Sequence, residues 1–196
     1  MNSIHFIKKQ PGSKFFGNPD VWEGFVWPEA KDKDGEEYHL NFLCQIDCAE
    51  ASKHDKDGML PKTGMLYFFY DLYDHYARNC AVLYYDGDLS ELTPHFLTDD
   101  EGLELFTRQA FHVELLLSSD ADMEGSFLLG TPSDPEQMGR GEGLDDDEQL
   151  LLEVDSYIGS HDLNFGGDCG MLCYIIKKDD LKNKDFSKVW TEMAIY

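Results

Sequence analysis

The feature that most constrains this 196-residue chain is a series of short motifs that occurs twice in the same order. The first motif is a glycine turn, read as "FFGNP" at Gly17 and as "LLGTP" at Gly130. A hydrophobic strand that ends in aspartate follows each turn, at Asp47 and at Asp155. A shared tripeptide arises easily by chance, but a shared order does not. The sequence therefore predicts an internal duplication.

Two further motifs extend the same order beyond the aspartates. In each half a hydrophobic strand begins with Gly-Met-Leu, at Gly64 and at Gly170. The same strand leads into an Asp-Leu pair, at Asp71 and at Asp180. A half-chain with one apolar sheet face is at best marginally stable alone in water. We therefore expect a single domain, residues 1–196, in which the halves 13–97 and 112–190 bury these faces against each other with approximate two-fold symmetry.

The clearest strand signal is the alternation in "YHLNFLCQID", residues 38–47. Five apolar side chains fall on one predicted face: Tyr38, Leu40, Phe42, Cys44 and Ile46. Leu43 interrupts the polar face, which indicates that something other than water covers it. Residues 65–70, "MLYFFY", form a nearly continuous apolar run, as in strands that are buried on both faces.

Further apolar runs complete the strand prediction at residues 81–85, 112–118, 150–154 and 171–176. Helix signals are weaker. Thr98 can cap a helix over residues 98–111, and a short helix is expected around 185–192. The polar stretch 133–148 has the composition of a mobile loop. Together these patterns predict a β-rich α+β fold with mostly antiparallel sheets and few helices.

The charge of the chain excludes two classes of partner. It has 16 Lys and Arg residues against 39 Asp and Glu residues, a formal net charge of -23. Such a charge repels nucleic acid and anionic membranes; it serves solubility and also attracts basic proteins. No apolar run approaches the ~20 residues that span a bilayer. We expect a cytoplasmic protein whose five cysteines are reduced.

These motifs resemble those of the YwqG-like family of bacterial proteins. The resembling segments cover nearly the whole chain and read "SKFFGNP", "WP", "LNFLCQID", "LPKTGMLYFF", "FLLGTP", "LLLEVDS", "GGDCGMLCYII" and "DLKNKDF". Three positions depart from the family pattern. Phe16 stands where a second glycine is usual, Glu153 where glutamine is usual, and residues 164–165 where a tryptophan often precedes Gly-Asp.

The resemblance implies a duplicated β-rich α+β fold in a family whose biochemical role is largely unassigned. Members are encoded in bacteria, sometimes near polymorphic toxins, which implies an immunity or partner-binding role. The departures concern a shared ligand site more than they concern the fold.

Metal and catalytic motifs give little support to an enzyme. The pairs Cys44/Cys48 and Cys169/Cys173 suggest a four-thiolate zinc site, but residues four apart on a strand lie ~13 Å from each other, too far for one zinc. The acidic clusters lack EF-hand spacing, so solvated loops are the simpler interpretation. There is no HExxH, Gly-x-Ser-x-Gly or phosphate-loop motif. We predict no catalytic residue, no metal and no cofactor.

The most distinctive polar positions lie at strand ends and turns. The candidate groove or turn residues are Trp27, Gln45, Asp47, Asp155, Gly167, Asp168 and Gly170. In one interpretation they line a groove between the halves. In the other, the aspartates accept backbone N–H bonds in tight turns and the tryptophan fills the core.

The leading functional hypothesis is a noncatalytic module that binds an unidentified protein partner, with a basic toxin as one candidate. The expected acidic surface and the missing catalytic motifs motivate it. The alternative is a metal-dependent or small-molecule enzyme with a pocket between the halves. The sequence leaves the partner, the ligand and the oligomeric state open.

Overall fold

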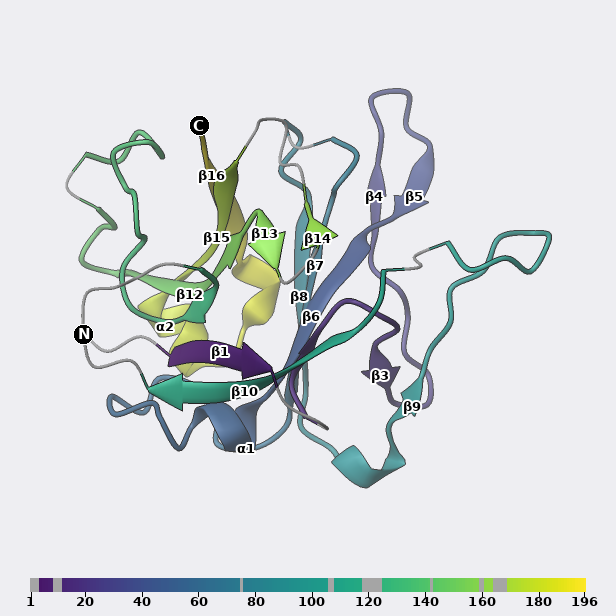
Figure 1. The fold of residues 1–196 in the computed structure, drawn as a ribbon, viewed down its shortest axis with the longest axis horizontal. Coiled ribbons are helices and arrows are strands. Elements are labelled where there is room, and N and C mark those ends of the chain that lie inside the picture. Colours follow the sequence, from purple (N-terminus) through teal and green to yellow (C-terminus); the bar gives the residue numbers. More distant parts are fainter. Residues whose placement is uncertain are drawn as a thin grey trace.

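The protein is built around one long antiparallel sheet (Figure 1). The computed structural model describes residues 4–8, 12–74, 76–105, 108–117, 125–141, 143–158, 161–163 and 169–196. Within these ranges, the ten strands of the sheet are, from edge to edge, β16 (Trp190–Ile195), β15 (Gly170–Lys177), β12 (Glu148–Asp155), β11 (Phe127–Leu128), β1 (Ile4–Lys8), β10 (Phe111–Leu117), β2 (Lys14–Phe15), β6 (Asn41–Asp47), β7 (Met65–Tyr70) and β8 (Cys80–Tyr85). The predicted β-rich α+β class is confirmed.

The remaining elements are short. Three ribbons pair β3 (Asp20–Val21) with β9 (Thr93–Pro94), β4 (Glu29–Lys31) with β5 (Glu37–His39), and β13 (Tyr157–Ile158) with β14 (His161–Asp162). The described helices are α1 (Cys48–Ala51), α2 (Lys178–Lys182) and the 3-10 turns η1 (Leu89–Glu91) and η2 (Phe186–Lys188). In the described part of the chain, no helix has the length and apolarity needed to cross a bilayer.

The two arms of the sheet have matching strand order and register. Asp47 lies opposite Met65 in the β6/β7 pair, and Asp155 lies opposite Met171 in the β12/β15 pair. Both pairs carry a bulge at the matching place, between Phe42 and Cys44 and between Leu150 and Leu152. At the centre, β10 of the second half pairs with β2 of the first half, and β1, which precedes the first half, pairs with β10 and β11. Common descent of the halves stays a prediction.

The bulge in β6 corrects the face assignment made from the sequence. A bulge adds one residue to a strand, so the side chains beyond it change face. Leu40 and Phe42 pack in a cluster with Trp27, whereas Cys44 and Ile46 belong to the main core. The expected single apolar face of residues 38–47 is therefore wrong. Leu43 is buried, as expected because an apolar residue on the polar face indicated that this face is covered.

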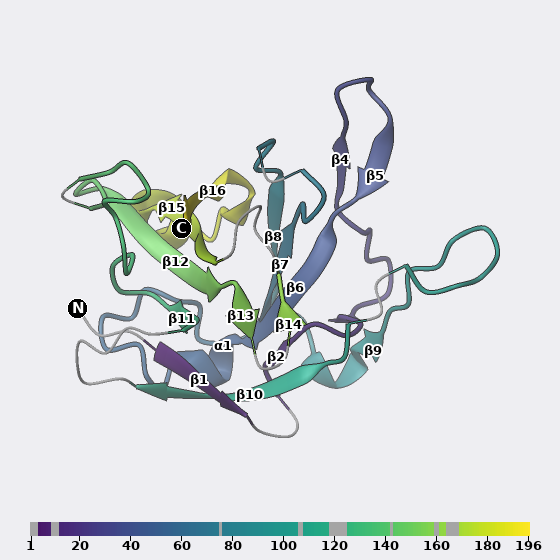
Figure 2. The same cartoon turned by 45° about the horizontal axis from the view of Figure 1, so that its top comes forward.

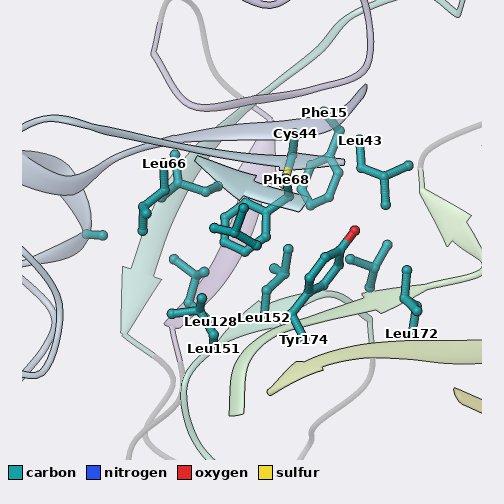
Figure 3. Packing of buried hydrophobic residues seen from close by; sticks show 14 of the residues in the cluster. Phe15, Leu43, Cys44, Leu66, Phe68, Leu128, Leu151, Leu152, Leu172 and Tyr174 are labelled. Carbon is teal, nitrogen blue, oxygen red and sulfur yellow. The ribbon is translucent and has the colours of Figure 1, made fainter. Parts of the chain in front are cut away.

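The two arms of the sheet face each other (Figure 2), and the side chains of the main core lie between them (Figure 3). It holds side chains from both halves, including Phe68 of β7 and Tyr174 of β15, whose rings meet edge to face with centroids 5.1 Å apart. The Tyr174 hydroxyl donates to the carbonyl of Phe69 at 3.0 Å. The two halves therefore share one interior, in which buried aromatic side chains from both pack together.

The predicted helix over residues 98–111 is wrong. Thr98 forms a bridge with Glu104, and Asp99 Oδ1 accepts two backbone N–H groups at 2.9 Å each, which makes the segment a tight turn. Phe111 already begins β10. Two residues of the predicted span lie outside the described chain.

The predicted helix around residues 185–192 is also wrong in its extent. Only the 3-10 turn η2 is helical there, and Trp190 begins strand β16. The real helices were not predicted. Asp47 Oδ1 caps α1 by accepting the N–H groups of Ala49 at 2.8 Å and Glu50 at 3.3 Å, so a helix of four residues follows the strand directly.

Candidate functional site

The residues predicted as a groove lie in different parts of the fold. Strands β6 and β12, which carry Asp47 and Asp155, are separated in the sheet by β2, β10, β1 and β11. Asp47 caps α1, and Asp155 accepts the N–H of Tyr157 at 2.7 Å. Both aspartates therefore serve local turns. Gly167 and Asp168 lie outside the described residues.

Trp27 and Gln45 are buried in the first half. The indole N–H of Trp27 donates to the carbonyl of Leu40 at 2.7 Å, and its ring meets Phe69 with centroids 5.5 Å apart. Gln45 Oε1 accepts the N–H of Asp20 at 2.9 Å. These contacts fix the segment that crosses the outer face of β6 and β7.

Asp155 and Gly170 do share one surface pocket of about 390 Å³ in the second half. The N–H of Gly170 donates to Ser156 Oγ at 3.1 Å, and Cys169 and Tyr196 also line the pocket. Trp27, Gln45 and Asp47 are not among its lining residues. Of the predicted set, the structure therefore brings together two described members.

A different pocket combines carboxylates with aromatic side chains, and we call it the acidic-aromatic pocket. It has a volume of about 510 Å³ and is lined by Asp32, Tyr38, His39, Tyr73, Asp74 and Leu105. These residues come from three segments: the β4/β5 hairpin, the turn after β7, and the turn around residues 98–105. The hairpin and that last segment project from the sheet in Figure 1.

Buried Asp71 does not line the acidic-aromatic pocket but holds three of its lining residues in place. It follows the last residue of β7, and its Oδ1 accepts the N–H groups of Tyr73 and Asp74 at 2.9 Å each. Its Oδ2 accepts the hydroxyl of Tyr38, and the Asn79 side chain donates to the same oxygen at 3.3 Å. One carboxylate therefore shapes the turn and orients the tyrosine across from it.

The hydroxyl of Tyr38 is held in its protonated form. Burial raises the pKa of Tyr38, and the hydrogen bond to the Asp71 carboxylate raises it further. The Asn79 side chain, which donates to the same hydroxyl at 2.9 Å, acts in the opposite direction. Because the hydroxyl stays protonated near neutral pH, Tyr38 has little phenolate available to accept a proton from a substrate, and its ring forms a wall of the pocket.

The two rim carboxylates are fixed by their own turns. Asp32 Oδ1 accepts the N–H groups of Asp34 and Glu36 at 2.9 Å each. Asp74 Oδ1 accepts those of Tyr76 and Ala77 at 3.1 Å each. These bonds use one oxygen of each carboxylate, which leaves the second oxygen for solvent or a ligand.

The walls of the pocket are apolar and open to solvent. Tyr73 is 75% exposed and Leu105 is 43% exposed. Among its lining residues there is no lysine or arginine. The arrangement suits a cation on an apolar stem: the stem contacts Tyr38, Tyr73 and Leu105, and the charge lies near the rim carboxylates.

The sequence marks Asp71 as part of a repeated motif and Tyr38 as a strand residue, but nothing in it connects the two. Their contact joins positions on two separate strands, and no local spacing predicts it. The signal that was available was the polar pair Asp71 and Asp74 directly after a buried strand.

A protein-family model matches this sequence. The model of a family described as "Domain of unknown function (DUF1963)" matches residues 13–128 and residues 114–194. No curated protein matches the sequence.

Proposed function

The chain belongs to the DUF1963 family, a domain of unknown function, and we propose that it is a noncatalytic module that binds a basic segment of a partner protein. The observation that carries this proposal is the acidic-aromatic pocket. It offers the carboxylates of Asp32 and Asp74 beside the rings of Tyr38 and Tyr73, with no lysine or arginine in its lining. A lysine or arginine side chain of a partner matches this combination.

The charge of the whole molecule supports the same partner class. With a formal net charge of -23, the protein attracts basic surfaces over a Debye length of ~10 Å at moderate ionic strength. Long-range attraction raises the association rate, and the pocket then holds one side chain by short-range contacts. A basic toxin, which the YwqG-like resemblance suggests, is one partner with this chemistry.

The experiment measures binding of a nona-lysine peptide by calorimetry as a function of salt. The test variant is Asp32→Asn with Asp74→Asn, because asparagine keeps the Oδ1 that accepts the turn N–H bonds and loses only the charge. The control variant is Glu136→Gln with Asp146→Asn, two exposed acids that do not line this pocket. Both variants lose the same number of charges.

We expect the test variant to bind the peptide about tenfold more weakly than the control, since a charge-assisted contact contributes roughly 1.5 kcal/mol or more. A third variant, Tyr73→Ala, should also weaken binding while keeping the charge. If the test and control variants weaken binding equally, attraction is spread over the whole surface and the pocket has no special role. That result would overturn the proposal.

A further inference from the structure

A second pocket lies where the two halves of the chain meet, and we call it the lysine pocket. It has a volume of about 600 Å³. One side is formed by residues 57–63, which connect α1 to β7, and the other by α2 and Lys184 of the second half. A volume of this size is within the range of sites for small organic ligands, ~300 to 1,000 Å³.

The charge of the lysine pocket is opposite to that of the protein. Lys62, Lys178, Lys182 and Lys184 line it, although the whole chain has only 16 Lys and Arg residues against 39 acids. The one carboxylate among the lining residues is Asp57. In a chain with such an excess of acidic residues, a lysine is expected to lie near a carboxylate. Four lysines around one pocket with a single acid depart from that expectation.

The lysines of this pocket differ from other lysines in their partners. Lys177 and Lys188 each form ion pairs with two carboxylates. Across the described ranges, by contrast, no carboxylate lies within ion-pair distance of Lys62, Lys182 or Lys184. Like charges that line one pocket repel, and an anion bound among them offsets that repulsion.

Contacts across the halves hold the pocket in shape. Lys184 Nζ lies 5.2 Å from the centre of the Tyr84 ring, and the Tyr84 hydroxyl donates to the carbonyl of Thr63 at 2.9 Å. Lys178 Nζ donates to the carbonyl of Asp146 at 2.7 Å, which leaves its remaining hydrogens available. The ammonium groups therefore extend from anchored segments rather than from a free terminus.

The floor of the lysine pocket is apolar. Leu60 and Leu181 are buried and line it together with Met59, which is half-buried. The N–H of Leu60 is fixed by Asp55 Oδ2 at 2.7 Å. A ligand that fits this floor carries an organic part as well as its negative charge.

We propose that the lysine pocket binds a phosphorylated small molecule, with its phosphate groups on the lysines and its organic part on the floor of Leu60 and Leu181. Lysine binds phosphate as a point charge, and several lysines around one pocket favour a ligand with more than one phosphate charge. This site is independent of the proposed binding of a basic partner, because the two pockets share no lining residue.

The experiment measures the affinity of pyrophosphate and of ATP by calorimetry at fixed ionic strength, and the thermal shift that each produces. The variants are Lys62→Gln and Lys182→Gln, and the matched control is Lys33→Gln, an exposed lysine in the β4/β5 hairpin. We expect each test variant to bind about tenfold more weakly than the wild type and the control to bind equally. ATP should bind more tightly than pyrophosphate, because only ATP covers the apolar floor.

Three results would each overturn the proposal. The first is no binding of either phosphate compound at millimolar concentration. The second is equal loss of binding in Lys33→Gln and in the pocket variants, which would indicate unspecific attraction. The third is tighter binding of citrate or of a hepta-glutamate peptide than of ATP, which would assign the pocket to carboxylates or to an acidic protein segment.

Discussion

Glu153 of β12 occupies, in the second half, the position that Gln45 of β6 occupies in the first. Each lies two residues before the aspartate that ends its strand, and each is almost completely buried, Gln45 at 2% and Glu153 at 1% exposed. Each accepts the backbone N–H of a residue that precedes its strand in the sequence: Asp20 of β3 donates to Gln45 at 2.9 Å, and Ser133 donates to Glu153 at 3.0 Å. The second half therefore buries an ionisable group where the first half buries a neutral amide.

Replacing Glu153 with glutamine should stabilise the protein at neutral pH. Burial raises the pKa of Glu153 and outweighs the opposing hydrogen bonds from Ser133 and Cys173. Because the folded pKa exceeds the unfolded value, the contribution of this group is fully present below the unfolded pKa and is lost as pH rises through the folded pKa. We expect Glu153→Gln to gain about 1 kcal/mol in free energy of unfolding at pH 7, and no gain at pH 4, in urea titrations.

The matched control for this prediction is Gln45→Glu. It places a carboxylate beside that of Asp20, to which the Gln45 amide now donates at 2.9 Å. We expect a loss of stability at pH 7 of about 1 to 2 kcal/mol that diminishes in acid. Equal stability of the wild type and Glu153→Gln at both pH values would show that the hydrogen bonds of Glu153 offset its burial completely.

Thiol reactivity should single out one cysteine. Cys169 is exposed, whereas Cys44, Cys48 and Cys173 are buried, and burial raises the pKa of each of these three thiols. Burial also raises the pKa of half-buried Cys80 to about 11. Since the thiolate is the reactive form, we expect fast titration of one thiol in the folded protein and of all five in urea.

The variant Cys169→Ser should abolish the fast phase of that titration. The same measurement tests the zinc alternative, because bound zinc would slow the reaction of Cys169 until a chelator is added. Within the described chain, the one group of side chains close enough to share an ion is Asp145, Asp147 and Glu148, and it contains no cysteine. If adding a chelator raised the reaction rate of Cys169, the thiol would be metal-bound, and the expectation of a free, fast-reacting Cys169 would be contradicted.

Arg140 should be the residue that fixes the polar stretch 133–148 to the sheet. Its side chain donates to Glu192 of β16, at 2.7 Å from Nε, and to Glu148 of β12. Burial alone would raise the pKa of Glu148, but the N–H of Asp145 and the cations Lys177 and Arg140 hold it below its ordinary value.

Removing this guanidinium leaves half-buried Glu192 without its ion pair and leaves buried Glu148 with Lys177 as its remaining ion-pair partner. We expect Arg140→Ala to lose about 3 kcal/mol at pH 7. A lowered carboxylate pKa gives stability that is present above the unfolded pKa and lost as pH falls, so the difference from wild type should shrink near pH 3. The control is Lys31→Ala, whose ion pair with Glu37 is exposed and should contribute less than about 1 kcal/mol. Equal losses in the two variants would contradict the role of Arg140.

Much of the sheet could be predicted because its strands are long apolar runs. The run at residues 65–70 is β7, and the runs at 150–154 and 171–176 lie inside β12 and β15. Strands β2 and β11 have two residues each, too few to show a period, and their place is fixed by pairing with distant strands. The bulge in β6 could not be predicted either, because one extra residue changes the face without changing the composition.

The site was harder to predict than the sheet. Asp47 and Asp155 stood out in the sequence, and the structure shows both accepting N–H bonds of their own turns, which was the simpler of the two interpretations. The two pockets depend on side chains that meet only after folding, such as Tyr38 with Asp71. The left-handed backbone of Phe16, with φ of 57°, gives a physical reason for the glycine expected there.

The contact between Tyr174 and the first half should report how far the two halves depend on each other. Its hydroxyl donates to the Phe69 carbonyl inside the shared core, so Tyr174→Phe removes one buried hydrogen bond and should cost about 1 to 2 kcal/mol. Phe68→Ala should cost more, about 3 to 5 kcal/mol, and Phe68→Asp should prevent folding. The control, Tyr76→Phe, changes a side chain that is 93% exposed and should leave stability within about 0.5 kcal/mol of wild type.

Urea unfolding followed by fluorescence and by circular dichroism should give one coincident transition in wild type and Tyr174→Phe. Two separate transitions would show that the halves fold independently, and the shared interior would then not be the main source of stability.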